Sequence, residues 1–84
     1  MELLTVIGAE YRGNYSLYIK FNDGLEGELD LEDHLWGEVF EPLKDKNAFQ
    51  KFRLNEWTIE WDCGADFAPE ALHKMISNSV SQLG

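Results

Sequence analysis

The sequence has little of what small proteins use as covalent or metal cross-links. Cys63 is the only cysteine among 84 residues, so no internal disulfide can form and no cysteine pair is available for a structural zinc ion. This usage is typical of a reducing compartment, and we expect the protein to be cytoplasmic. The first residues have neither the basic region nor the long hydrophobic region of a signal peptide, and no hydrophobic run is long enough to span a membrane.

Basic side chains are also scarce. Seven Lys and Arg stand against sixteen Asp and Glu, which gives a formal net charge of −9. Because the phosphates of nucleic acids and of anionic lipids are bound by basic surfaces, this composition argues against direct binding to nucleic acid or to membranes. At 44% hydrophobic and 13% aromatic residues, the chain is too apolar to be disordered, and we expect a single domain over residues 1–84.

Three segments in the first third of the chain have the alternating pattern of β-strands. They cover residues 3–11, 15–21 and 25–31, and the turns between them are predicted at residues 12–14 and 22–24.

The second turn can be predicted in more detail. Directly paired residues share a face, so an apolar face through Phe21 must continue at Leu25, which requires a three-residue loop. We expect a type I turn closed by Gly24 in the left-handed region, with Lys20 opposite Glu26 on the solvent face.

The second half of the chain is predicted to be less regular. Residues 33–46 should lack a long helix because of Pro42, and Asp45 should cap a short helical turn after them. A second hairpin is predicted over residues 52–62, in which Leu54 faces Trp57 across a two-residue loop. The hydrophobic anchors of these segments are predicted to be Trp36, Val39, Phe40, Leu43, Phe49, Trp57, Ile59 and Trp61.

A C-terminal helix should begin at Pro69, which suits the first helical position, with Asp66 bending back towards the free amides at its start. Its hydrophobic positions repeat at helical spacing at Leu72, Met75, Ile76, Val80 and Leu83. The resulting fold class is α+β, an antiparallel sheet of about four to five strands with the C-terminal helix packed on one face.

Neither histidine predicts catalysis. His73 could serve Cys63 as a base, but the acidic neighbours Asp62 and Asp66 disfavour a thiolate, so we predict no catalytic residues and no enzymatic activity. His73 is more simply paired with Glu70, three residues earlier on the helix.

His34 lies among acidic residues that resemble metal ligands, namely Asp30, Glu32, Asp33 and Glu38. Zinc sites usually contain two or more His or Cys ligands, and calcium loops have a different spacing, so we assign no metal and no cofactor. A small-ligand or divalent-metal-binding domain built on His34 stays as the alternative function.

The distribution of charge is the most specific signal. Residues 25–45 contain eight acids and one lysine, a net charge of −7, while the rest of the chain is nearly balanced. This stretch can be a solvated face that keeps a small protein soluble, or a docking face for a basic protein. Tyr18 and Trp36 are candidate interface anchors, and Asp30 has no structural role visible in the sequence. The predicted partner-binding residues are Glu26, Glu28, Asp30, His34 and Trp36.

Several motifs together resemble the small bacterial family catalogued as domain of unknown function 2442. They are Phe21-Asn22-Asp23-Gly24, Leu29-Asp30-Leu31, Val39-Phe40-Glu41-Pro42-Leu43, Thr58-Ile59-Glu60-Trp61 and Gly64-Ala65-Asp66-Phe67-Ala68-Pro69-Glu70-Ala71-Leu72. The resemblance implies an α+β domain with no established activity. It also implies an antitoxin-like or gene-cassette accessory role, although the helix-turn-helix that some members carry has no counterpart here.

We therefore expect a non-enzymatic, cytoplasmic protein-interaction module with a basic protein partner. Homodimerisation is a further expectation, because a sheet this short has exposed edges and a modest core.

Overall fold

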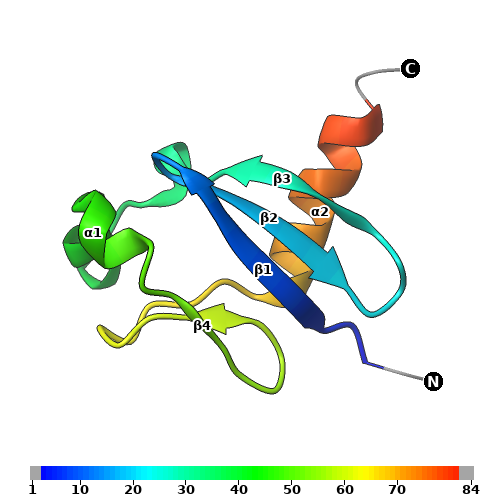
Figure 1. Cartoon of the computed structure of the whole chain (residues 1–84), viewed down its shortest axis with the longest axis horizontal. Coiled ribbons are helices and arrows are strands. Elements are labelled where there is room, and N and C mark those ends of the chain that lie inside the picture. The colour runs from blue at the N-terminus through cyan, green and yellow to red at the C-terminus, as the bar shows by residue number, and fades with distance from the viewer. Residues whose placement is uncertain (1–2, 82–84) are drawn as a thin grey trace.

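The centre of the molecule is an antiparallel sheet of three strands. The computed structural model describes residues 3–81, with side chains up to residue 78. The strands β1 (Val6–Gly13), β2 (Ser16–Phe21) and β3 (Glu26–Asp30) follow one another in the order β1-β2-β3 (Figure 1). With the C-terminal helix behind the sheet, the architecture is α+β, as the sequence predicted.

The turn between β2 and β3 confirms the three-residue loop. The amide of Gly24 donates to the carbonyl of Phe21 at 3.2 Å, and Gly24 has a φ of 96°. Lys20 lies directly opposite Glu26. The carboxylate of Asp23 accepts from the amide of Leu25 at 3.0 Å, which further fixes the loop.

The turn between β1 and β2 lies later than predicted. β1 continues to Gly13, which pairs with Ser16, so the turn is formed by Asn14 and Tyr15. Gly13 and Asn14 both have positive φ, which allows the tight reversal. Arg12 consequently belongs to the strand and not to the turn.

The helix α2 (Pro69–Ser81) covers the inner face of the sheet (Figure 1). It begins at Pro69, as predicted, and buries Leu72 and Ile76. Gly27 of β3 permits this close approach, because a Cβ there would lie 3.0 Å from Cγ2 of Ile76. The helix continues the predicted pattern as far as its side chains are described. The predicted contacts of Val80 and Leu83 fall outside the described side chains.

No hydrogen bond joins the Asp66 carboxylate to the start of α2 within residues 3–81, which does not support the predicted cap. The carbonyl of Ala68 accepts from the amides of Ala71 and Leu72 instead. Asp66 has a backbone role, since it forms an isolated antiparallel bridge with Glu60.

A second, two-stranded sheet consists of β4 (Arg53–Leu54) and β5 (Ile59–Glu60). The sequence predicted one sheet of about four to five strands, whereas the structure divides its five described strands between two sheets. The predicted register of this hairpin was wrong, because Leu54 pairs with Ile59 and not with Trp57. Residues 55–58 form the loop, and Trp57 is 48% exposed instead of sharing the buried face of Ile59 and Trp61.

Short helical turns connect the two sheets. They are the 3-10 helices η1 (Glu32–His34) and η2 (Glu38–Lys44) and the single-turn helix α1 (Lys46–Phe49). Asp45 caps α1, as predicted, by accepting from the amide of Asn47 at 3.0 Å. Leu35, Leu43 and Phe49 are buried, whereas the predicted anchors Trp36 and Val39 are exposed.

The hydrophobic core lies between the inner face of the three-stranded sheet, α2 and the second hairpin. The indole of Trp61 donates to the carbonyl of Phe49 at 2.7 Å, and the hydroxyl of Thr58 donates to the carbonyl of Phe67 at the same distance. The hydroxyl of Tyr15 likewise donates to the carbonyl of Lys44 and ties the sheet to η2. Polar groups in the core are thereby satisfied. No helix among residues 3–81 is long and apolar enough to cross a membrane.

Candidate partner-binding surface

Strand β3 presents three carboxylates on the outer face of the sheet, away from α2. Glu26, Glu28 and Asp30 are exposed, and they alternate with Gly27 and Leu29, which face the core. The register confirms this arrangement, because each acid lies opposite a residue on the outer face of β2. The structure thus brings these three predicted site residues together in a row.

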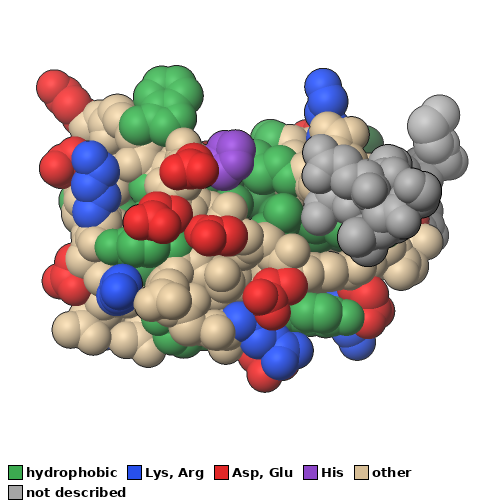
Figure 2. Space-filling view, turned by 90° about the horizontal axis from the view of Figure 1, so that it is seen from above, with side chains coloured by type: hydrophobic (Ala, Val, Ile, Leu, Met, Phe, Trp, Pro, Cys, Tyr) green, Lys and Arg blue, Asp and Glu red, His purple; other side chains and the backbone are tan. Residues whose placement is uncertain are grey.

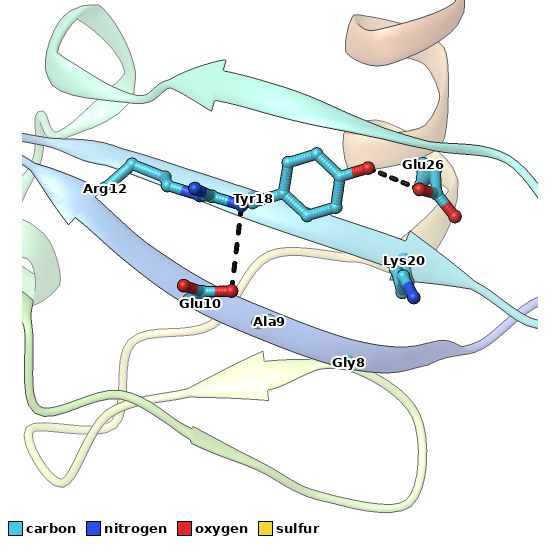
Figure 3. Close-up of a pocket in the computed structure, with 7 residues that line it drawn as sticks. All are labelled: Gly8, Ala9, Glu10, Arg12, Tyr18, Lys20 and Glu26. Atoms are coloured by element: carbon cyan, nitrogen blue, oxygen red, sulfur yellow. Dashed lines mark hydrogen bonds and ion pairs between the residues drawn. The ribbon is translucent and has the colours of Figure 1, made fainter.

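Part of the outer face is a groove of about 490 Å³ that is open to solvent. Its lining residues come from all three strands and are Gly8, Ala9, Glu10, Arg12, Tyr18, Lys20 and Glu26 (Figure 3). Two acidic and two basic side chains line it, so the groove itself carries balanced charge.

Tyr18 is held in the middle of this groove. Its hydroxyl donates to Oε1 of Glu26, and the guanidinium carbon of Arg12 lies 4.8 Å from the centre of its ring (Figure 3). The hydrogen bond to Glu26 raises the pKa of Tyr18, so the phenol stays neutral and remains a donor. Tyr18 is half-buried. The predicted interface anchor is therefore engaged within the sheet, through its hydroxyl with Glu26 and through its ring with Arg12.

The acids that follow Glu26 along β3 and the next loop have no described basic side chain within ion-pair distance. The ion pairs among the described residues join Arg12 to Glu10, Lys44 to Glu41, Arg53 to Glu60 and Asp62, and His73 to Asp23. Glu28, Asp30, Glu32, Asp33 and Glu38 take part in none of them. Asp45, Glu56, Asp66 and Glu70 also have no ion pair within residues 3–81, but they are scattered along the chain, whereas five unpaired acids follow one another between residues 28 and 38 without a Lys or Arg among them.

Asp30 has a structural role that the sequence did not reveal. Its Oδ1 accepts from the amide of Glu32 at 3.0 Å, and this bond fixes the exit of β3 into η1. The second carboxylate oxygen of Asp30 has no hydrogen bond to the part of the chain that the structure describes and is the atom proposed below for an external contact.

The other two predicted contact residues lie in the loop after β3. His34 ends η1 and is exposed, and the buried side chain of Leu35 anchors the loop beside it. Trp36 follows and is 73% exposed, which is unusual for a tryptophan and typical of interface anchors. In the view from above, acidic side chains gather around a histidine on one face of the molecule (Figure 2).

His34 has no described ligand partners for a metal ion. Among the residues that the structure describes, no group of three or more His, Cys, Asp or Glu side chains could hold one. The acids that follow one another along β3 and η1 are thus close in sequence without converging on a point.

His73 and Cys63 are engaged separately. Nε2 of His73 lies 2.8 Å from Oδ2 of Asp23, and its ring packs edge-on against Phe21 at 5.0 Å, so the predicted pairing with Glu70 was wrong. The pKa of Asp23 is lowered, first by the amide of Leu25 and then by His73. The thiol of Cys63 is exposed and lies 3.5 Å from the carbonyl of Val39.

A charged cluster on the second hairpin was not predicted from the sequence. Arg53 contacts Glu60 at 3.0 Å and Asp62 at 2.6 Å, and the amide of Asn55 donates to Glu60 at 2.7 Å. The bond from Asn55 and then those from Arg53 lower the pKa of Glu60. The opposite charges at residues 53, 60 and 62 were visible in the sequence. They predict a cluster only when the register of the hairpin is known.

Comparison with known proteins gives a single result. Residues 6–76 match the model of the family described as Protein of unknown function (DUF2442), which confirms the resemblance seen in the sequence motifs. No curated protein and no solved structure matches the chain. The match covers the whole three-stranded sheet, the acidic loop, the second hairpin and the first two turns of α2.

Proposed function

The chain belongs to the DUF2442 family, whose function is unknown, and from this premise we propose that it is a non-enzymatic module that binds a basic protein through β3 and the following loop. We call this surface the acidic surface and define it by Glu26, Glu28, Asp30, His34 and Trp36.

The observation that carries the proposal is the run of acids from Glu28 to Glu38, which are unpaired in the described part of the chain and have no Lys or Arg among them. Elsewhere in the described chain, Arg12, Lys44 and Arg53 each lie against an acid, whereas Glu28 and Asp30 are exposed without a cationic neighbour in an ion pair. Repulsion between adjacent like charges on one strand face is unfavourable for folding. A basic partner would remove that repulsion on binding, so the arrangement favours the bound state.

Trp36 gives this surface an apolar contact in addition to charge. Exposed charge mainly accelerates encounter and sets orientation, while a large aromatic side chain supplies most of the binding energy at a typical hot spot. The combination supports a protein partner over a small ion. An antitoxin-like role, in which an acidic protein neutralises a basic one, is the most specific form of this function.

The test is affinity purification of the tagged protein from its own cells in about 0.1 M salt, where the Debye length is about 10 Å. The test variant is Glu28→Lys with Asp30→Lys, and the matched control is Glu56→Lys with Glu70→Lys, which changes net charge equally at exposed acids outside the acidic surface. We expect a basic protein to be recovered with the wild type and the control and to be lost with the test variant.

Equal recovery with the two charge-reversal variants would show that reversal at Glu28 and Asp30 has no special effect and would contradict the proposal. A Trp36→Ala variant is a second test. If Trp36 is a hot spot, less of the basic protein should be recovered although the charge is unchanged.

A further inference from the structure

Strand β3 is an outer strand of the three-stranded sheet. The order β1-β2-β3 leaves one of its edges without a neighbouring strand among the described residues. An open edge of this kind exposes backbone donors and acceptors that can pair with another chain.

The hydrogen-bonding pattern identifies which backbone groups face that edge. The amide of Phe21 donates to the carbonyl of Leu25 at 2.9 Å, and at the other end the amide of Leu31 donates to the carbonyl of Tyr15 at 2.8 Å. Antiparallel ladders alternate between hydrogen-bonded and non-hydrogen-bonded pairs, so Gly27 and Leu29 also bond towards β2.

The amides and carbonyls of Glu26, Glu28 and Asp30 must therefore point the other way, towards the open edge. The ladder with β2 leaves these groups unused, and outside that ladder none of them has a backbone partner among residues 3–81. The same three residues that carry the acidic side chains thus also carry the free backbone groups.

The charges select the occupant of this edge. A strand paired here places one of its residues directly opposite each acid, on the same face of the extended sheet. A second copy of β3 would place carboxylates opposite carboxylates, which is unfavourable. Lysine or arginine at every second position of the added strand would instead form three cross-strand ion pairs.

The inner face of β3 is held in place by packing against α2 and the core. Ile76 of α2 packs against the backbone at Gly27, and Leu29 is buried in the core. An incoming strand would meet a preformed edge, which lowers the entropy lost on binding.

We propose that β3 binds its partner by antiparallel strand addition, pairing the backbone groups of Glu26, Glu28 and Asp30 with an extended segment of the basic protein that has Lys or Arg at alternate positions. This inference rests on the proposed function and specifies its binding mode.

The experiment uses the full chain labelled with ¹⁵N and the capped peptide Lys-Thr-Lys-Thr-Lys as the probe. We expect amide exchange at Glu26, Glu28 and Asp30 to slow by roughly tenfold or more at saturation, because these amides become hydrogen-bonded. The amides of Gly27 and Leu29, which already pair with β2, should change little.

Two N-methylated peptides provide matched controls of equal charge. Methylation of the three lysines removes the amides that would pair with β3, whereas methylation of the two threonines blocks amides that point away from it. Strand addition requires the first peptide to lose binding and the second to retain it.

The proposal would be overturned by equal binding of the two methylated peptides, by binding that leaves the three amides unprotected, or by no binding at all. Protection that rises with protein concentration in the absence of peptide would identify a second copy as the occupant and would also overturn it. If charge reversal abolishes partner recovery while the amides stay unprotected, the proposed function stands and only strand addition fails. If the peptide protects these amides but charge reversal leaves partner recovery unchanged, the proposed function fails.

Discussion

Gly24 shows how a single residue sets the position of the acidic surface. Its positive φ closes the loop between β2 and β3 and fixes the register that places Glu26 opposite Lys20. A change of one residue in this register would turn the three carboxylates of β3 towards the core.

Replacement of Gly24 by alanine should therefore destabilise the protein. No atom of the described residues lies within 4 Å of the added Cβ, so the cost comes from the left-handed backbone and should be about 1 kcal/mol in the free energy of unfolding. The measurement is urea denaturation of the wild type and the variant.

Gly8→Ala is the matched control for this experiment. Gly8 lacks a positive φ, and its nearest atoms would lie 3.8 Å from the new Cβ, an ordinary contact. Its midpoint should stay close to that of the wild type. Equal losses at the two glycines would show that conformational strain at Gly24 is not the cause.

Residue-scale features were predictable where the signal was local. The turn at Gly24, the cap at Asp45 and the helix start at Pro69 each depend on a few neighbouring residues, and the structure confirms all three. The contact of His73 with Asp23 joins residues 50 positions apart. Only the packing of α2 against the sheet determines it, so the sequence favoured the nearer Glu70.

At the scale of elements, the second hairpin shows how a side chain can override strand pattern. Alternation of Trp57, Ile59 and Trp61 predicted a two-residue loop. The carboxamide of Asn55 instead accepts from the amides of Trp57 and Thr58, at 2.7 and 2.8 Å, and lengthens the loop to residues 55–58. Thr58 and Ile59 are then both buried, which breaks the alternation.

Thr58 connects this hairpin to the segment before α2. Its hydroxyl donates to the carbonyl of Phe67 inside the core, so Thr58→Val should leave that carbonyl without its partner and lower the free energy of unfolding by about 1–3 kcal/mol. Thr58→Ser retains the hydroxyl and should lose less. Thermal unfolding of both variants tests this, and a valine variant as stable as the wild type would show that the hydrogen bond contributes little.

The acidic surface was only partly predictable at this scale. The alternation in residues 25–31 correctly placed Glu26, Glu28 and Asp30 on one exposed face, because β3 belongs to a regular meander. The groove around Tyr18 was not visible, since it depends on Arg12 belonging to β1 and on contacts between three strands. The role of Asp30 at the start of η1 was also missed because it needs the exact end of the strand.

For the whole molecule, the net charge of −9 has a cost for stability as well as a proposed use. Glu28 has no ion pair among the described residues and lies between two other acids on β3. Glu28→Lys should therefore raise the melting temperature of the isolated protein by about 1–3 °C in low salt, because it relieves repulsion.

The salt dependence distinguishes this electrostatic effect from a change in packing. The gain in melting temperature should shrink towards zero in about 1 M salt, where the Debye length is about 3 Å. A gain that persists at high salt would indicate a contact of the new lysine, and a loss of stability in low salt would show that Glu28 supports the fold.

The order of the strands also bears on how quickly the molecule can form. Each strand of the two sheets pairs with its neighbour along the chain, and no crossover connection is needed among the described residues. Closing a loop of few residues has a small entropic cost. Proteins whose contacts join residues close in sequence fold fast for their size. The acidic strand β3 is joined to β2 by a three-residue loop, so only a short loop has to close before its inner edge is paired.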